Sequence, residues 1–432
     1  MTAGVLSETG SAICLLFIFL IPLASAGLAL INTGLGRSRS AAHTMLAALC
    51  ILATAAVAFA AIGFAVEGYA GRAAYAVMLQ GKPWNWIASE RFFLRGLGFD
   101  GGRAALAALF GMMAAGLAAM IPLGSALDRW RLGASVAATA VLAAWTYPLF
   151  AHWVWGGGWL AQLGATYHLG SGFIDSGGSG AIQAVGGLTA LATTWILGPR
   201  RGKYSPQGMP SAIPGHDAVL VLTGCLLAWI GWMGLNSAGA ILFTGAAWGE
   251  AALVAVNTTL AAGAAGMTAA GITRLRFRKT DASLAANGFV GGLAASSAGC
   301  AVLPPAAAIL TGIVAGVLVV YSVEWLELHL SVDDPGGAIS VHGVGGLWGV
   351  LAVAFFARVP GGGEGQWVAQ MAGVGTLLGF VFPLTYGVNA LLNLVYHQRV
   401  APDGERQGLD LHELGAGAYP DFLTHNEDAW QR

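Results

Sequence analysis

The chain has 432 residues, of which 56% are hydrophobic and only 9% are charged, roughly a third of the charged share of an average soluble domain. The formal net charge of -1 provides no basic surface, which excludes nucleic acid as an expected partner. The four cysteines stand singly and show neither metal-ligand spacing nor a disulfide framework. With 65 glycines, the composition is typical of a polytopic α-helical membrane protein, whose small residues let helices approach closely.

Apolar segments of membrane-spanning length follow one another along the whole chain. A bilayer requires about 20 apolar residues per helix. The first segment runs past the small residues Ala24–Ala26 to Leu35, which favours a transmembrane helix over a cleaved signal peptide. We expect eleven spans, at 11–34, 41–67, 102–125, 132–153, 177–198, 217–236, 250–273, 282–299, 303–326, 337–358 and 367–397. The predicted fold is therefore a single all-α membrane domain over residues 1–432, with a tail at 398–432.

The distribution of Lys and Arg predicts the orientation of these spans. Most of them fall in the loops that would share one side, including Arg37, Arg129, Arg200 and the run 274–279. Short cytoplasmic loops carry such an excess, so we expect the N-terminus outside and the C-terminus in the cytoplasm of an inner (plasma) membrane protein. The exceptions lie mostly in the long outer loop 68–101.

An internal repeat is the most informative feature of the sequence. The fifth span contains Gln183 followed by Ala-Val-Gly-Gly-Leu, and the tenth contains His342 followed by Gly-Val-Gly-Gly-Leu. An aspartate, Asp175 or Asp334, precedes each by eight residues, and 159 residues separate the two copies. The repeat predicts two halves of five spans, at 11–198 and 217–358, with an eleventh helix at 367–397. Because each half has an odd number of spans, the halves have opposite orientations, and such folds place the substrate path near their interface.

Gln183 and His342 place polar side chains in the middle of apolar spans. Such side chains are costly in a membrane and usually face the bundle interior or a cavity. We expect the two to face each other across a narrow pathway, where they hydrogen-bond a small polar solute. For Asp334 we expect an N-cap with Pro335 at the first helical position. Asp175 is also expected to cap a helix, and a second role beside an outer cation site stays open.

Tryptophans cluster between the fourth and fifth spans. Trp153 and Trp159 fit the aromatic belt of a membrane interface. Trp155 precedes three glycines and is a candidate for holding a cation over its ring, an attraction worth roughly 0.5–2 kcal/mol.

These motifs, in this order, resemble those of the Amt/Mep/Rh ammonium transporters over nearly the whole chain. The matching segments are Gly27–Leu30 with Gly34–Leu35, Gly124–Arg129, Ala151–Gly158, Gly231 with Asn236, Val332–Pro335, Val341–Val344 and Gly408–Leu411. The resemblance implies a homotrimer with a pore in each subunit, and a PII signalling protein as a partner at the cytoplasmic face. It also implies that ammonium binds outside, loses a proton, and passes a phenylalanine gate into a channel lined by two histidines.

The resemblance assigns roles to individual positions. Trp155 matches the outer cation–π tryptophan, Phe110 the outer gate phenylalanine, Asp175 an aspartate near that site, and His342 the second channel histidine.

This sequence departs from the family pattern along the expected substrate path. Gln183 replaces the first channel histidine, Leu235 the second gate phenylalanine, Gly239 an outer-site serine, and Gly337 an aspartate. Glutamine does not titrate, so a proton relay along a histidine pair is broken here. Loss of a ring at Leu235 and of a hydroxyl at Gly239 predicts a wider and less polar outer site.

Three functions follow from these residues. The first is transport of ammonium or ammonia through a modified pore. The second is transport of a larger methylated or quaternary amine such as choline, which suits an aromatic cage. The third is sensing of ammonium without useful flux. The sequence shows no nucleophile–base pair or metal cluster, so we expect neither an enzyme nor a cofactor.

Overall fold

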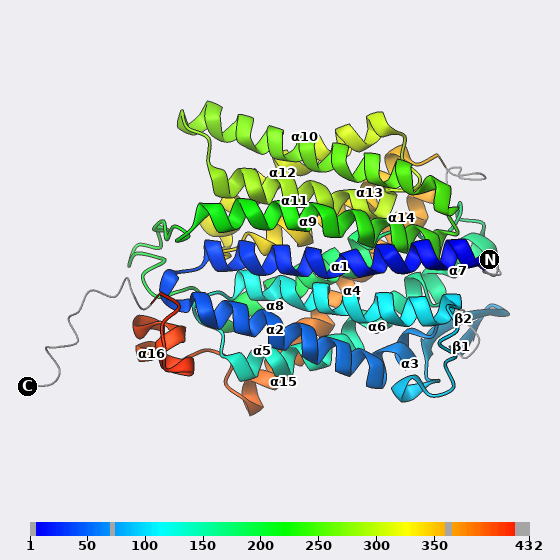
Figure 1. Cartoon of the computed structure of the whole chain (residues 1–432), viewed down its shortest axis with the longest axis horizontal. Helices are drawn as coiled ribbons and strands as arrows, with labels where there is room; N and C mark the ends of the chain where they lie inside the picture. Colours follow the sequence, from blue (N-terminus) through cyan, green and yellow to red (C-terminus); the bar gives the residue numbers. More distant parts are fainter. Residues whose placement is uncertain (1–5, 70–73, 359–364, 420–432) are drawn as a thin grey trace, which may run out of the picture.

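The expected spans form helices that run along the long axis of the bundle in the computed structural model (Figure 1), which describes residues 6–69, 74–358 and 365–419. The start of α1 lies at one end of this axis, and α16 lies at the other. The helices of the bundle are α1 (Glu8–Leu35), α2 (Ala41–Ala58), α3 (Phe64–Glu67), α4 (Arg103–Ser125), α5 (Leu132–Val141), α6 (Tyr147–Val154), α7 (Trp159–Tyr167), α8 (Val185–Leu197), α9 (Ala218–Gly239), α10 (Ala251–Phe277), α11 (Ala282–Gly299), α12 (Pro305–Leu330), α13 (Gly345–Phe356), α14 (Gly365–Thr376) and α15 (Phe382–Val395).

Several spans change from α- to π-helical winding along their length. π-Helical turns are rare and frequently mark functional sites. They join α2 to α3 and α5 to α6, precede α8 and α13, follow α9, and join α14 to α15, at Phe59–Gly63, Leu142–Thr146, Ser179–Ala184, Ile339–Val344, Ala240–Thr244 and Leu377–Val381.

The predicted membrane character is confirmed. Among the described residues, ten helices are long and apolar enough to cross a membrane. The remaining expected span, 282–299, is α11, a helix of 18 residues within the bundle. It is less apolar because it carries Asn287, Ser296 and Ser297 among its buried residues. Arg72 and Arg432, two of the residues behind the expected orientation, lie outside the described residues.

The long loop 68–101 contains a β-hairpin that the sequence analysis did not predict. Strands β1 (Ala74–Leu79) and β2 (Lys82–Ala88) pair antiparallel, at the same end of the bundle as the start of α1 (Figure 1). The ring of Trp84 stacks on that of Trp159, with centroids 5.4 Å apart. Trp153, expected at a membrane interface, is instead buried and donates a hydrogen bond from Nε1 to the backbone oxygen of Trp86 (2.7 Å).

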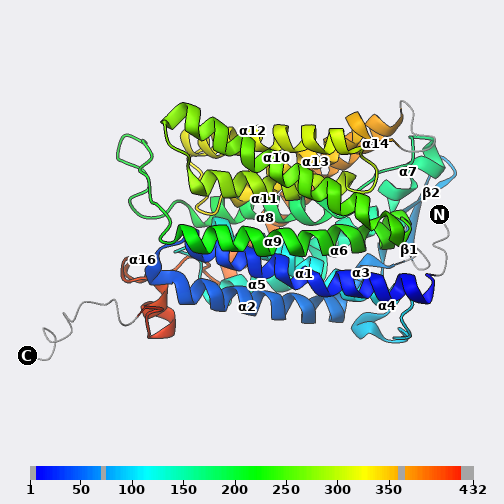
Figure 2. The same ribbon diagram turned by 45° about the horizontal axis from the view of Figure 1, so that its top comes forward.

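Helices α1 and α9 pack side by side along the middle of the bundle (Figures 1 and 2). Glycines make this contact possible. A Cβ atom on Gly27 would lie 2.5 Å from the backbone nitrogen of Ala228, and one on Gly231 would lie 2.0 Å from that of Ala24. Small residues therefore bring the two backbones together, as is usual between membrane helices.

The repeated Val-Gly-Gly-Leu segments meet in the same way. A Cβ atom on Gly187 would lie 2.1 Å from the nitrogen of Gly343, and one on Gly346 would lie 2.8 Å from the nitrogen of Ala184. Gly346 and Gly343 are the repeat partners of Gly187 and Ala184, so the contact is reciprocal. A two-fold axis produces such reciprocity. We propose on this ground that residues 11–198 and 217–358 are inverted repeats.

A buried ion network ties loops together near α16 (Pro402–Gln407). Asp333 accepts hydrogen bonds from Arg200 Nε (2.9 Å) and Nη2 (3.0 Å), and Arg200 Nη1 donates to Asp128 (3.1 Å). Burial on its own raises the pKa of Asp333, but the bonds from Arg200 and the nearby Arg129 outweigh it and lower this pKa to about 2. Asp333 is therefore ionised and fully engaged at neutral pH.

The tail docks by supplying acceptors to exposed helix starts. Asp410 accepts from the backbone N–H groups of Ala42 (3.2 Å) and His43 (2.7 Å) at the start of α2. Glu413 accepts from the N–H of Leu132 (2.9 Å) at the start of α5 and contacts His43 Nε2 (2.9 Å). The first N–H groups of a helix lack partners within the helix and attract negative charge. The tail thus completes two helices of the bundle.

Replacing Gly187 with alanine tests the close contact between α8 and the segment before α13. The added methyl group would lie 2.1 Å from the nitrogen of Gly343, so the helices must separate. We expect a loss of about 1–3 kcal/mol, measured as thermal unfolding in detergent. Gly387→Ala in α15 is the matched control, because a Cβ atom there meets nothing within 4 Å. Equal melting temperatures for the two variants would contradict the packing argument.

The docking of Glu413 predicts a pH dependence of the tail. Burial raises the pKa of Glu413, but hydrogen bonds from His43 and from the Leu132 N–H outweigh it, so its pKa lies below the ordinary value. A lowered carboxyl pKa contributes stability above the unfolded value of about 4.3, and this is lost as the pH falls through the folded value. Hydrogen exchange at residues 408–414 should rise roughly tenfold below that point. Glu413→Gln should show faster exchange already at pH 7; unchanged exchange in this variant would refute the docking role.

Candidate functional site

Gln183 and His342 come together at the centre of the bundle, as the repeat predicted. His342 Nδ1 lies 2.8 Å from Gln183 Oε1. Gln183 is 0% exposed and His342 is 3% exposed. Each belongs to a π-helical segment, Ser179–Ala184 or Ile339–Val344, held close to the other by the glycines described above. The indole of Trp232 flanks the imidazole, with ring centroids 6.3 Å apart.

The chemistry of an amide fixes the direction of this hydrogen bond. A carboxamide oxygen only accepts, so His342 Nδ1 carries the proton and donates it to Gln183. In the neutral imidazole, Nε2 is then an acceptor. Gln183 Nε2 is buried and has no hydrogen-bond partner among the residues that the structure describes. The pair therefore presents one free donor and one free acceptor.

Both repeat aspartates cap helix starts. Asp175 accepts from the N–H groups of Gly180 (3.0 Å) and Ala181 (2.8 Å), and Asp334 accepts from those of Ala338 (3.0 Å) and Ile339 (2.8 Å). Burial raises the pKa of Asp175 to about 6, against the effect of its backbone donors. Both expected caps are confirmed. Pro335 was wrongly expected at the first helical position: it lies in a turn with Gly336, and the helix begins at Ala338.

Phe110 and Trp155 lie together with Phe243 in an aromatic cluster near the hairpin end of the bundle. Phe110 contacts the other two rings edge-on, at centroid distances of 5.9 Å to Trp155 and 5.2 Å to Phe243. Trp155 and Phe243 stack face to face, 4.3 Å apart and 7° from parallel. Trp155 Nε1 donates to the backbone oxygen of Asp175 (2.8 Å), which links the cluster to the capped helix start.

Leu235 and Gly239 lie one turn apart near the end of α9, and both are buried. A Cβ atom on Gly239 would lie 2.5 Å from the backbone oxygen of Ser176, so a serine does not fit here without a shift. The expected widening of the outer site stays a prediction. Phe243, one further turn along, packs its ring against Trp155 and Phe110.

Sequence reasoning missed Phe243. Its signal was its spacing, because 235, 239 and 243 recur every four residues and share one helix face. Spacing alone does not show which rings Phe243 contacts, because its partners come from other segments of the chain. Tyr69 was also missed: its ring lies 6.2 Å from that of Phe243, and its hydroxyl donates to the backbone oxygen of Leu242.

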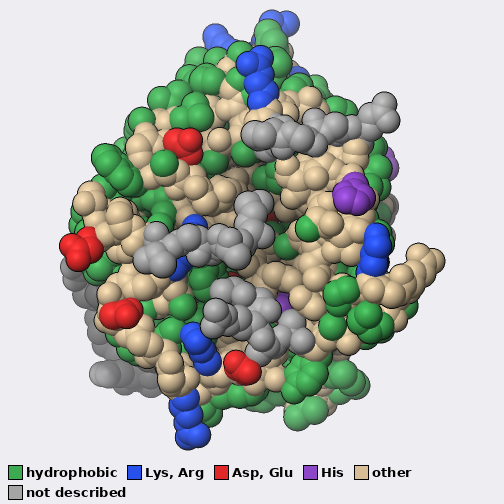
Figure 3. Space-filling model, turned by 90° about the vertical axis from the view of Figure 1, so that its right-hand side faces the viewer, with side chains coloured by type: hydrophobic (Ala, Val, Ile, Leu, Met, Phe, Trp, Pro, Cys, Tyr) green, Lys and Arg blue, Asp and Glu red, His purple; other side chains and the backbone are tan. Residues whose placement is uncertain are grey.

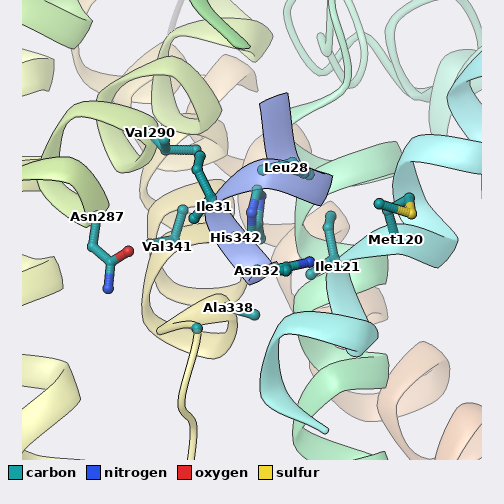
Figure 4. Close-up of a pocket in the computed structure, with 11 residues that line it drawn as sticks. Leu28, Ile31, Asn32, Met120, Ile121, Asn287, Val290, Ala338, Val341 and His342 are labelled. Carbon is teal, nitrogen blue, oxygen red and sulfur yellow. The ribbon is translucent and has the colours of Figure 1, made fainter. Parts of the chain in front are cut away.

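A small cavity lies next to His342 (Figure 4). Its volume is about 10 Å³, close to the room that one water-sized molecule needs. Apolar side chains from α1, α4 and α11 form most of the wall, and two asparagines, Asn32 and Asn287, interrupt it. The remaining lining residues are Leu28, Ile31, Met120, Ile121, Val290, Gly336, Ala338, Val341 and His342.

Charge does not mark an entrance on the hairpin end of the bundle. Figure 3 shows this face with charged side chains of both signs scattered among its described residues, without a patch of a single sign in the part that is not drawn in grey. Nor do the described residues contain a group of three or more His, Cys, Asp or Glu side chains that fits a metal ion.

Comparison with known proteins decides the family. The sequence model of the Ammonium Transporter Family matches residues 12–419. This chain belongs to that family. It is 36% identical to ammonium transporter Amt2 of Archaeoglobus fulgidus, over 94% of this chain and 87% of that protein. It is 33% identical to ammonium transporter 1 member 1 of Oryza sativa subsp. japonica, over 81% and 75%.

Solved structures of family members have the same fold. A structure named Sensor Amt Protein superposes with a TM-score of 0.83 at 29% identity, over 93% of this chain and 97% of that one. Mep2 of Candida albicans superposes with a TM-score of 0.79 at 23% identity, over 95% and 90%, which shows the fold alone. The chain is therefore a multi-pass membrane protein of a transporter family.

Proposed function

We propose that this chain transports ammonium across the membrane, and that the species passing its centre is ammonia. The observation that carries this proposal is the buried hydrogen bond between His342 and Gln183 (2.8 Å). It leaves Gln183 Nε2 as a donor for the lone pair of ammonia, and His342 Nε2 as an acceptor for one of its N–H groups. Ammonium has no lone pair, so it can donate a hydrogen bond to His342 Nε2 but cannot accept one from Gln183 Nε2.

The outer residues have roles before this point. Trp155 attracts the cation with its ring, and Phe110 and Phe243 close the way inward. Asp175 holds Trp155 through its backbone oxygen and keeps a buried carboxylate beside the entrance. Leu235 and Gly239 form the tight wall from which Phe243 projects. Deprotonation takes place at this outer level, because Gln183 cannot pass a proton onward.

The dimensions favour ammonium over larger amines. Rings stacked 4.3 Å apart leave no gap for any cation between Trp155 and Phe243 until one ring moves, and a bulky cation such as trimethylammonium requires the larger movement. The inner cavity of about 10 Å³ does not admit choline. Sensing without flux has no specific observation in its favour here, since the Sensor Amt name belongs to another protein.

We also propose the setting in which this pore works. Arg37, Arg129 and Arg200 lie at the end of the bundle that α16 contacts, which supports a cytoplasmic C-terminus and an outer hairpin in the plasma membrane. Family resemblance supports a homotrimer. It also supports a PII signalling protein as a partner of the cytoplasmic end.

Flux in proteoliposomes tests the proposed function. Labelled methylammonium and ammonium-driven pH rise in the lumen are measured against empty liposomes, with trimethylammonium and choline alongside. We expect ammonium entry above the empty control and no entry of the two bulky cations. Entry of the bulky cations alone, or no entry of any amine, would overturn the proposal.

Gln183→His tests the broken proton relay. A histidine pair can exchange protons, so we expect the current per ammonia delivered to rise at least about tenfold, on a solid-supported membrane at pH 7. Gln183→Leu is the control that removes both hydrogen-bonding groups, and it should lower uptake without adding current. If the wild type and Gln183→His carry equal current per ammonia, protons pass by another route.

Phe243→Ala tests the role of the stacked ring. Removing it uncovers Trp155, so methylammonium uptake relative to ammonium should rise about two- to tenfold, the worth of one aromatic pair. Phe355→Ala removes an exposed ring elsewhere and should leave the ratio as it is. An unchanged ratio in Phe243→Ala would mean that this ring does not limit entry.

A further inference from the structure

Glu67 is a carboxylate buried inside the bundle without a counter-charge. It is the last residue of α3, at the hairpin end of the bundle, and is 2% exposed. Its Oε2 atom has no hydrogen-bond partner, and no Lys or Arg among the described residues forms an ion pair with it. An ionisable side chain within a membrane span is costly and usually marks a path for ions or protons. A purely structural role leaves the free oxygen unexplained.

Two more polar groups without partners come from α6, which packs against α3. His152 is fully buried, and its Nδ1 lies 2.7 Å from the backbone oxygen of Glu67. A carbonyl oxygen only accepts, so Nδ1 carries the proton and Nε2 is a free base, without a partner among the described residues. The buried hydroxyl of Tyr147 has no partner there either. This part of the bundle therefore offers free acceptors, Glu67 Oε2 and His152 Nε2, and lacks donors for them.

The elements around α3 do not neutralise Glu67. Strand β2 contributes Lys82, which donates instead to the backbone oxygen of Thr166. Tyr69 and Tyr147 lie within electrostatic range of the carboxylate and are uncharged at neutral pH. Three other neighbouring segments carry no titratable side chain, namely Phe59–Gly63, Phe92–Leu94 and Leu142–Thr146. The carboxylate can therefore gain and lose a proton without breaking an ion pair.

The end of α3 is joined directly to the outer aromatic cluster. A Cβ atom on Gly156, the residue after Trp155, would lie 2.0 Å from the backbone oxygen of Glu67, so the two segments touch. Two residues beyond Glu67, the ring of Tyr69 packs on that of Phe243, with centroids 6.2 Å apart. Glu67 is thus anchored next to the rings at which the cation is proposed to lose its proton.

Asp175, another buried acid near this cluster, is already engaged. Its Oδ1 accepts from the N–H of Gly178 (3.1 Å). Its Oδ2 accepts from the N–H groups of Gly180 (3.0 Å) and Ala181 (2.8 Å). A proton on this carboxylate would compete with the bonds that cap the helix start. Glu67 has a free oxygen and no such bonds to lose.

We propose that Glu67 accepts the proton that ammonium loses at the outer site, with His152 as a positioning residue. This inference rests on the proposed function and names its proton acceptor. One N–H bond of ammonium breaks, its electron pair stays on nitrogen as the lone pair of ammonia, and an O–H bond forms at the Glu67 carboxylate. The carboxyl group then releases the proton to water on the outer side. Each ammonia that enters leaves its proton outside.

The dependence of initial uptake on external pH tests this role in proteoliposomes, at a fixed total ammonium concentration. Without an acceptor only ammonia already free in solution enters, so uptake by Glu67→Gln should rise about tenfold per pH unit. The wild type draws on ammonium itself, so its rate should depend less steeply on pH and exceed that of the variant at least about tenfold at about pH 6. Glu67→Asp keeps a carboxylate and should keep the shallow dependence at a lower rate. Glu90→Gln changes an exposed glutamate near the hairpin and should match the wild type.

His152→Asn and His152→Leu test the positioning role. An asparagine amide can still donate to the backbone oxygen of Glu67, so His152→Asn should keep the shallow pH dependence. Leucine cannot donate, so His152→Leu should approach the steep dependence of Glu67→Gln. Equal losses of rate in both His152 variants, with the wild-type profile kept, would contradict the positioning role.

The shape of the pH profile separates proton transfer from a structural role. A wild-type profile in Glu67→Gln, or a loss by the same factor at every pH, overturns the inference and leaves the proposed transport standing. So does a wild type whose own uptake rises about tenfold per pH unit, because free ammonia then enters without an acceptor. That wild-type profile and Glu67→Asp decide the question even if Glu67→Gln melts below the wild type in detergent. Absence of any wild-type uptake above empty liposomes overturns the proposed function itself.

Discussion

The hydrogen bond from His342 Nδ1 to Gln183 Oε1 depends on the approach of two backbones, and much of the structure serves that approach. Gly187 and Gly346 let the two repeats contact each other without intervening side chains. Asp175 and Asp334 cap the segments that carry the pair. Glycines also allow the close contact between α1 and α9 elsewhere in the bundle. A membrane protein gains little from burying apolar side chains against each other, so close packing by glycine and satisfied polar groups must hold this centre together.

The sequence was sufficient to predict what depends on spacing. The eight residues from each aspartate to its pore residue, and the offset between the copies, predicted the caps and the meeting of Gln183 with His342. The length of the apolar segments predicted the spans. Helix α11 also has the expected position, but its polar residues make it less apolar than the other spans. These features are local or repeated, and therefore they can be recognised in the sequence alone.

What could not be predicted depends on contacts between distant segments. Phe243 occupies space that no local rule assigns to it, because its partners come from α4 and from the end of α6. Asn32 and Asn287 are far apart in the sequence, and only the fold shows that α1 and α11 bring them to the wall of one cavity with His342. The hairpin lies in the loop 68–101, which the sequence analysis recognised only because it lacks an apolar span. Pro335 was misplaced because a turn, followed by a glycine of positive φ, delays the start of its helix.

The stacking of Phe243 on Trp155 has a consequence for affinity. A ring face that is already covered is available to a cation only in the fraction of molecules in which the cover has moved aside. The apparent dissociation constant is the intrinsic one divided by that fraction. Weak saturation by external ammonium would thus report the equilibrium of one phenylalanine ring as much as the strength of any contact. If Trp155 holds the cation as proposed, small changes in packing around Phe243 would change the apparent dissociation constant without any contact to the substrate.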